Sequence, residues 1–142
     1  PGLEDLCGTV IGAALRAGGI DPDAIEIDVL FTGDDEIAAI NAEWRGKDKP
    51  TNVLSFPAPQ DMPVPPGELR PLGDIVLAAG VVAREAAEQG KTLRDHTAHL
   101  IVHGVLHLTG HDHEEDGEAE AMERLEIDIL KGLGIPNPYE RH

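Results

Sequence analysis

Basic residues are scarce in this chain. Its 142 residues include 11 Lys and Arg against 27 Asp and Glu, which gives a formal net charge of −16. Phosphate backbones are held mainly by Lys and Arg, so this balance excludes a protein that coats nucleic acid through a broadly basic surface. A nucleic-acid substrate would require either a compact basic patch or a basic partner protein.

Cysteine is rare, and long apolar runs are missing. Cys7 is the only cysteine, which excludes an internal disulfide and favours a reducing compartment, so we expect the cytoplasm. No stretch approaches 18 consecutive apolar residues, so we expect no membrane-spanning helix. The length and the 41% hydrophobic content fit one globular domain over residues 1–142.

Hydrophobic periodicity predicts a small α/β (α+β) domain of about five helices and three strands. Residues 57–71 contain six prolines and little periodicity, so we expect an exposed mobile loop there. The acidic face of the last helix is expected to be solvated. The predicted helices are 3–17, one opening at 34, 81–89, 92–109 and 115–132, and the predicted strands are 24–32, 52–56 and 73–78.

Three histidines are crowded into one short segment. His103, His107 and His113 follow an H-x3-H-x5-H spacing, and Gly110 stands three residues after the second. A four-residue spacing places His103 and His107 on one helical face, about one turn apart. Gly110 can end the helix in a left-handed conformation, which turns the chain back and brings the third imidazole to the same point.

Three imidazoles with one open position form the ligand set of a catalytic zinc. We therefore predict one Zn²⁺ per chain on the helix 92–109, with His111 as the alternative to His113 as third ligand. His96 and His99 extend the histidine stripe toward the start of this helix. Because buried imidazoles are costly unless coordinated or hydrogen-bonded, the stripe is expected to have partners.

The histidine segment has the ligand spacing of the metzincin peptidase signature H-E-x-x-H-x-x-G-x-x-H. Gly104 stands where a metzincin carries its general-base glutamate, so peptide hydrolysis by that mechanism is not expected. Glycine within a helix costs roughly 1 kcal/mol relative to alanine. Two explanations stay open for it: room at the metal for a bulky substrate, and close packing of the helix on a sheet.

Three motifs, taken in order, resemble the YbeY family of single-domain, metal-dependent endoribonucleases. They are residues 41–56 (NAEWRGKDKPTNVLSF), residues 72–75 (LGDI) and the histidine segment, and the likeness extends from about Ile40 to His113. Two positions depart from the family pattern, which often has tyrosine at His111 and aspartate at Asn52. The first departure puts a hydroxyl role at that position in doubt.

The resemblance implies a small mixed β-sheet packed among helices, zinc on His103, His107 and His113, and a functionally important Arg45. It also implies cleavage of single-stranded RNA, in 16S ribosomal RNA 3′-end maturation and ribosome quality control. The precursor RNA would be the substrate, and basic ribosomal or ribosome-associated proteins would be the partners that an acidic surface favours.

Arg45 suits phosphate chemistry, because a guanidinium forks two hydrogen bonds onto phosphate oxygens and stabilises the charge of a transition state. An arginine near a helix C-terminus is otherwise a residue that compensates the helix dipole. Lys47 and Lys49 follow Arg45 in the one compact basic run, where we expect RNA to bind.

Further candidates surround these motifs with less specific signals. The residues expected to line the substrate site are Thr51, Asn52 and Ser55. Those expected near the metal, orienting an imidazole or forming a turn, are Asp74, His99, His111 and Asp112.

Two other functions compete with RNA cleavage. The same zinc could serve a metallopeptidase or a small-molecule hydrolase, although the absent glutamate argues against the peptidase. A metal could also brace a non-catalytic ribosome assembly factor, whose acidic surface would bind a basic protein.

Overall fold

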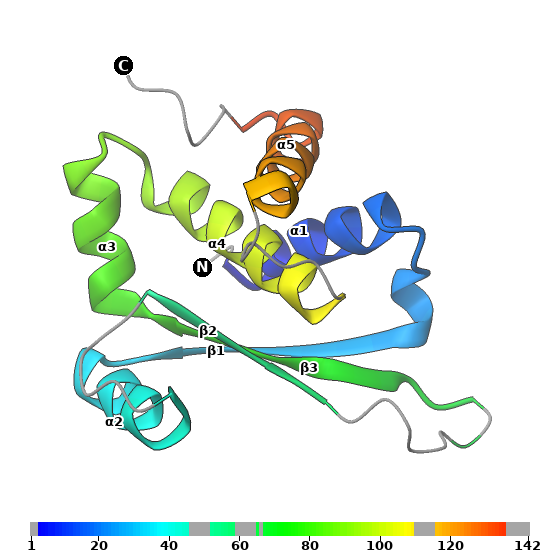
Figure 1. The fold of residues 1–142 in the computed structure, drawn as a ribbon, viewed down its shortest axis with the longest axis horizontal. Helices are drawn as coiled ribbons and strands as arrows, with labels where there is room; N and C mark the ends of the chain where they lie inside the picture. Colours follow the sequence, from blue (N-terminus) through cyan, green and yellow to red (C-terminus); the bar gives the residue numbers. More distant parts are fainter. Residues whose placement is uncertain (1–2, 46–51, 59–64, 66, 110–115, 136–142) are drawn as a thin grey trace.

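The computed structural model describes residues 3–45, 52–58, 65, 67–109 and 116–135 (Figure 1). These residues form a mixed three-stranded sheet with helices on both faces. The elements in chain order are α1 (Leu3–Ala17), the short 3-10 helix η1 (Pro22–Ala24), β1 (Ile25–Thr32), α2 (Asp34–Arg45), β2 (Val53–Pro57), β3 (Arg70–Ala78), α3 (Ala79–Glu88), α4 (Leu93–Leu108) and α5 (Asp116–Gly132).

Every predicted helix and strand is present, and the α/β (α+β) class is confirmed. The expected loop over 57–71 is wrong at both ends, because Pro57 still belongs to β2 and β3 begins at Arg70. Pro57 is held in β2 by its pairing with Gly73, and Arg70 and Pro71 are held in β3 by their pairing with Ile25 and Glu26 of β1. Residues 59–64 and 66 of the expected loop lie outside the described residues.

The strand order in the sheet is β1-β3-β2. The central strand β3 runs parallel to β1 and antiparallel to β2, so the sheet is mixed, as the family resemblance implied. A parallel pair requires a crossover, and the crossover from β1 to β3 contains α2. This connection places α2 on one face of the sheet, while α1 and α4 lie on the other (Figure 1).

Side chains of β3 alternate between two hydrophobic clusters. Ile75 and Leu77 belong to the main core with α1, α4 and α5. Val76 and Ala78 point to the opposite face and pack in a smaller cluster with Ile37 of α2. The sheet therefore separates α4 from α2.

Helix α4 is the central helix of the domain, since it contacts α1, α3, α5, β2 and β3. It begins after Thr92, the N-cap, whose Oγ1 accepts a hydrogen bond from the backbone N–H of Asp95 at 3.0 Å. Its buried residues occupy most of its circumference. No helix in the described part of the chain is both long and apolar enough to cross a membrane.

Candidate metal centre

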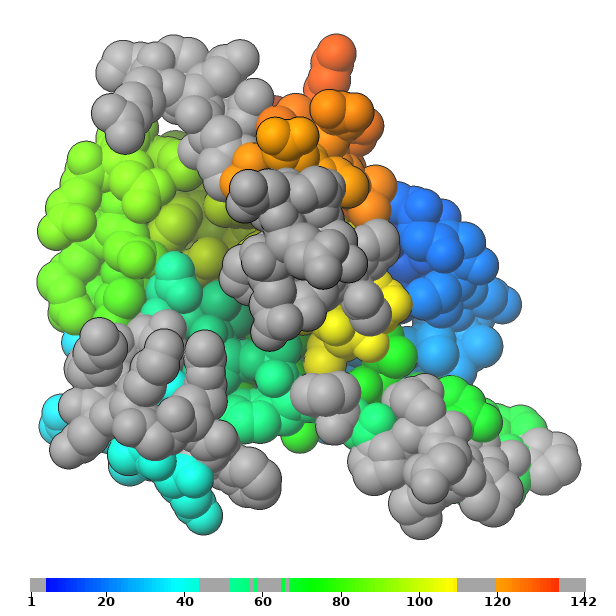
Figure 2. Space-filling view, in the orientation of Figure 1, coloured from blue at the N-terminus to red at the C-terminus, as the bar shows by residue number. Residues whose placement is uncertain are grey.

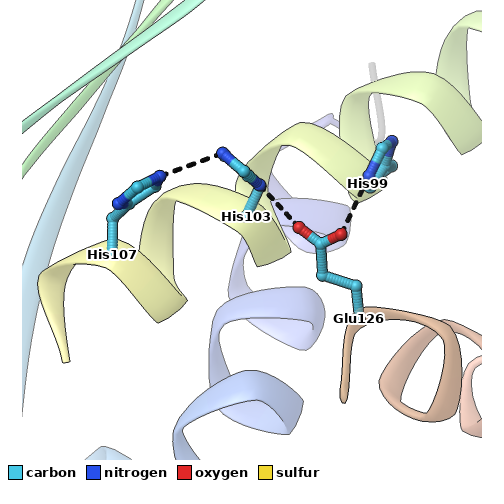
Figure 3. A network of polar contacts seen from close by, with 4 residues as sticks. All are labelled: His99, His103, His107 and Glu126. Atoms are coloured by element: carbon cyan, nitrogen blue, oxygen red, sulfur yellow. Dashed lines mark hydrogen bonds and ion pairs between the residues drawn. The ribbon is translucent and has the colours of Figure 1, made fainter. Parts of the chain in front are cut away.

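His103 and His107 lie one turn apart on α4, and their rings point toward each other (Figure 3). The two Nε2 atoms are 3.0 Å apart, and the ring planes stand at 74° to one another. Both side chains are partly exposed, near the C-terminal end of α4. That end of the helix (yellow) reaches the molecular surface beside the strands (green) in Figure 2.

This pair of nitrogens fits a tetrahedral metal ion. With Zn–N bonds of 2.0–2.1 Å, tetrahedral geometry separates two ligand nitrogens by about 3.3–3.4 Å. The observed 3.0 Å between the Nε2 atoms of His103 and His107 is within a few tenths of an ångström of that value. Imidazole nitrogens suit zinc and other first-row transition metals, whereas calcium and magnesium prefer oxygen ligands.

Glu126 of α5 reaches the other side of the His103 ring. Its Oε1 lies 2.5 Å from His103 Nδ1, and its Oε2 lies 3.4 Å from His99 Nε2 (Figure 3). The expectation that the acidic face of the last helix is solvated is wrong for this residue, which is 0% exposed. The sequence did contain an indication of this burial, because Glu126 lies at four-residue spacing between Met122 and Leu130, on the apolar face of the helix.

When Glu126 is ionised, its carboxylate only accepts hydrogen bonds, and His103 then donates its Nδ1–H to it. The lone pair of His103 is then on Nε2, directed at His107. A metal-binding histidine commonly donates its other ring N–H to a carboxylate in this way. The arrangement therefore prepares His103 Nε2 to bind a cation.

A second polar network surrounds the first turn of α4. The buried His96 donates from Nε2 to Glu85 Oε1 of α3 at 3.0 Å, and Asn52 Nδ2 donates to the same oxygen at 3.1 Å. Burial lowers the pKa of His96, although its hydrogen bond and the charge of Glu85 oppose the shift. Burial also lowers the pKa of Lys91, again against the attraction of Glu85. The network ties the start of β2 to α3 and α4.

Gly104 faces the sheet at the point where α4 passes closest to it. A Cβ added there would lie 3.0 Å from Ile75 Cδ1 and 3.1 Å from Ser55 Oγ. Of the two explanations for this glycine, close packing of helix on sheet is the one that applies. Ile75 and Ser55 occupy the space beside it, so a side chain such as the metzincin glutamate would require them to shift.

The other predicted residues fall into three groups. Ser55 lies beside Gly104 on the α4 side of the sheet, and Asn52 contacts Glu85 of α3 just before β2. Asp74 is exposed within β3 on the face away from α4, since it alternates with Ile75. The third group lies outside the described residues: Lys47, Lys49, Thr51, His111, Asp112 and His113.

Arg45 is the last residue of α2, and the structure describes its backbone only. The basic run therefore begins where α2 ends, and the described chain resumes at Asn52, before β2. Among the described residues, no group of three His, Cys, Asp or Glu side chains could hold a metal ion. The predicted third ligand, His113, and its alternative, His111, lie outside the described residues.

Comparison with known proteins gives a consistent answer over nearly the whole chain. A family model described as Endoribonuclease YbeY matches residues 2–134. A protein of that name from Chelativorans sp. (strain BNC1) is 57% identical, covering 92% of this chain and 78% of its own length. Another, from Allorhizobium ampelinum, is 59% identical over 83% of this chain and 70% of its own.

A solved structure supports the same relationship. The solution structure of TM1509 from Thermotoga maritima superimposes with a TM-score of 0.57 and 26% sequence identity, covering 98% of this chain and 91% of the other. The fold is therefore shared along the chain rather than at the histidine helix alone. On the family match and the identity of these relatives, the chain belongs to the YbeY family.

Proposed function

We propose that this protein is a metal-dependent endoribonuclease. The observation that carries the proposal is the convergence of His103 Nε2 and His107 Nε2 at 3.0 Å, with the far side of the His103 ring held by the buried Glu126. Such a pair, exposed at the surface and presented by a rigid central helix, is suited to a catalytic ion. The RNA substrate is supported by relatives that carry the name Endoribonuclease YbeY.

One zinc ion would be held by His103, His107 and a third histidine, His113, with His111 as the alternative. When bound, the ion supplies polarisation of a phosphoryl oxygen or activation of a water molecule. The described residues contribute the orientation of the ligands. Helix α4 holds two imidazoles one turn apart, and Glu126 of α5 contacts Nδ1 on the far side of the His103 ring.

Arg45 would bind the scissile phosphate and stabilise the negative charge that develops on its oxygens. Its place at the end of α2 puts it at the beginning of the run that contains Lys47 and Lys49. In a chain of net charge −16, this run is the part suited to a phosphodiester backbone. Thr51, Asn52 and Ser55 would line the same site.

The biological setting that fits these features is the cytoplasm, with ribosomal RNA precursor as substrate. We propose single-stranded RNA at the 3′ end of 16S ribosomal RNA, in maturation and quality control of ribosomes. The excess of acidic side chains complements basic ribosomal or ribosome-associated proteins, which could deliver the RNA.

Peptide hydrolysis is the weaker alternative because of the packing at Gly104. The Cβ of a glutamate there would lie 3.0 Å from Ile75 Cδ1 and 3.1 Å from Ser55 Oγ, so these side chains would have to shift. Without that group, a metzincin-type mechanism has no base at the required position. A non-catalytic assembly factor is the other alternative, and the cleavage assay below separates it from an enzyme.

The test is a cleavage assay with labelled single-stranded RNA, duplex RNA, single-stranded DNA and a peptide panel. Zinc-loaded protein should cleave single-stranded RNA, and His107→Ala should lose both stoichiometric zinc and cleavage. His142→Ala removes a histidine from the last position of the chain and serves as the control. Zinc-dependent peptide cleavage without RNA turnover, or full cellular function of a cleavage-dead His107→Ala protein, would contradict the proposal.

A further inference from the structure

Glu126 is a carboxylate in a place where carboxylates are rarely found. It is 0% exposed and lies in α5 beside Met122 and Leu130, which belong to the main hydrophobic core. An ionised carboxylate in such surroundings is costly unless its oxygens accept hydrogen bonds. Both oxygens do so here, one from His103 and the other from His99.

The two hydrogen bonds assign a tautomer to each imidazole. An ionised Glu126 only accepts hydrogen bonds, and opposite it His103 carries its proton on Nδ1 and His99 carries a proton on Nε2. His103 Nε2 is then left with a lone pair facing His107 Nε2 at 3.0 Å. An N–H on His103 Nε2 would instead point a hydrogen at the place where a cation would bind.

The same contacts join two helices. His99 and His103 belong to α4, and Glu126 belongs to α5. The chain between Leu108 and Asp116, from the end of α4 to the start of α5, contains both candidates for the third ligand, His111 and His113. Holding α5 against α4 therefore fixes both ends of the segment that completes the site.

We propose that Glu126 is a positioning residue for the metal centre: it sets the tautomer of His103 and locks α5 to α4 through His99. This inference rests on the proposed metal site but concerns a residue that neither the histidine motif nor the metzincin spacing contains. A purely structural carboxylate would affect stability alone. A positioning residue also changes the tautomer of His103 and the affinity of the site for zinc.

The test uses Glu126→Gln, which keeps the shape of the side chain but replaces one acceptor oxygen by an NH₂ donor. Glu123→Gln, one turn earlier on the exposed side of α5, is the matched control. Nitrogen-15 NMR of histidine-labelled, metal-free protein at about pH 8 reports the tautomer of His103. Competition with a chromogenic chelator gives the Kd for zinc, and circular dichroism shows whether each variant is folded.

Wild-type protein and Glu123→Gln should both show His103 protonated on Nδ1. Glu126→Gln should show a mixture of tautomers and bind zinc about 10- to 100-fold more weakly, the range typical of losing a residue that orients a ligand. Zinc affinity within twofold of wild type together with an unchanged His103 tautomer would overturn the proposal.

If Glu126→Gln does not fold, the wild-type spectrum still decides. Metal-free wild type with the His103 proton on Nε2 would contradict the assignment, whatever the variant does. Zinc binding by the wild type is a separate measurement. A wild type that takes up no zinc but has His103 protonated on Nδ1 would contradict the proposed function and support the role of Glu126 in setting the tautomer.

Discussion

Gly104 of α4 packs directly against Ile75 of β3, with 3.0 Å between the position of a Cβ on the glycine and the Cδ1 atom of Ile75. The contact occurs between His103 and His107, so it sets the height of the histidine pair above the sheet. A helix with a larger residue here would have to move away from β2 and β3. The absence of a side chain is thus a structural requirement at this position.

Gly104→Ala should destabilise the protein, although alanine is the better helix former by about 1 kcal/mol. Overpacking against Ile75 and Ser55 costs typically 1–3 kcal/mol, which outweighs that gain. Urea unfolding measures the difference. Ile75→Val removes the nearest atom, so the double variant should recover part of the loss, and a variant Gly104→Ala more stable than wild type would contradict this packing.

Glu85→Ala should cost about 1–3 kcal/mol, because it leaves the buried N–H of His96 without an acceptor. Asn52 loses its partner in the same variant. Glu88→Ala, on the exposed side of the same helix, is the matched control and should change stability by less than about 0.5 kcal/mol. Equal losses in the two variants, measured by chemical unfolding, would show that the network contributes nothing specific.

Stability should fall on acidification partly because of His96. Burial lowers the pKa of His96 in the folded protein, while Glu85, Lys91 and His99 are the ionisable groups that act on it. A lowered pKa means that protonation favours the unfolded chain. The stability that His96 contributes is fully present above the ordinary histidine pKa of about 6.5. It is lost as the pH falls through the lowered pKa of His96 in the folded protein.

Comparison of wild type with His96→Gln at about pH 7.5 and pH 5.5 isolates this contribution. The variant should lose less stability than the wild type between the two conditions, since glutamine does not titrate. His142→Gln is the control and should behave as the wild type. Parallel losses in wild type and His96→Gln would contradict the assigned direction of the pKa shift.

Arg45→Lys should leave zinc content and stability unchanged but slow RNA cleavage about 10- to 1,000-fold, the scale of losing one preorganised donor in a transition state. Lysine keeps the charge but cannot bind a phosphate through a bidentate fork. Arg45→Glu should be slower still. Single-turnover rates at saturating enzyme measure the effect, with the exposed Arg94→Lys as control. A wild-type rate in Arg45→Lys would remove this residue from the mechanism.

The order of elements and the histidine pair could be predicted from the sequence because both depend on local spacing. Amphipathic periods of two and of 3.6 residues define the strands and helices, and a four-residue spacing necessarily stacks His103 on His107. Thr92 likewise caps α4 through atoms only three residues away. These relationships do not depend on the rest of the fold.

The partners of the histidines could not be predicted in the same way, since they come from other helices. Glu126 and Glu85 are two acids among 27 acidic residues in the chain, and only tertiary packing brings them to α4. Their position was nevertheless visible as a weak signal. Glu126 follows Met122 by four residues, and Glu85 follows Val82 by three, so both lie on apolar faces.

The function of Gly104 also depended on the fold. The position of Gly104 in the motif showed that the metzincin glutamate is missing, but it did not show which residues lie against the glycine. Ile75 and Ser55 come from two strands that are separated from α4 in the sequence, and their approach is set by the register of β2 on β3. Ser55 pairs with Ile75 in that register, which is why both meet the same glycine.

We propose that a metal held by His103 and His107 is required for cleavage of RNA. The most direct measurement is single-turnover cleavage of a labelled single-stranded RNA by protein stripped of metal, then titrated with zinc. Activity should be absent in the stripped protein and should rise in proportion to bound zinc up to one ion per chain, while His107→Ala stays inactive throughout. Full cleavage by stripped protein, with zinc verified as absent by elemental analysis, would contradict the account.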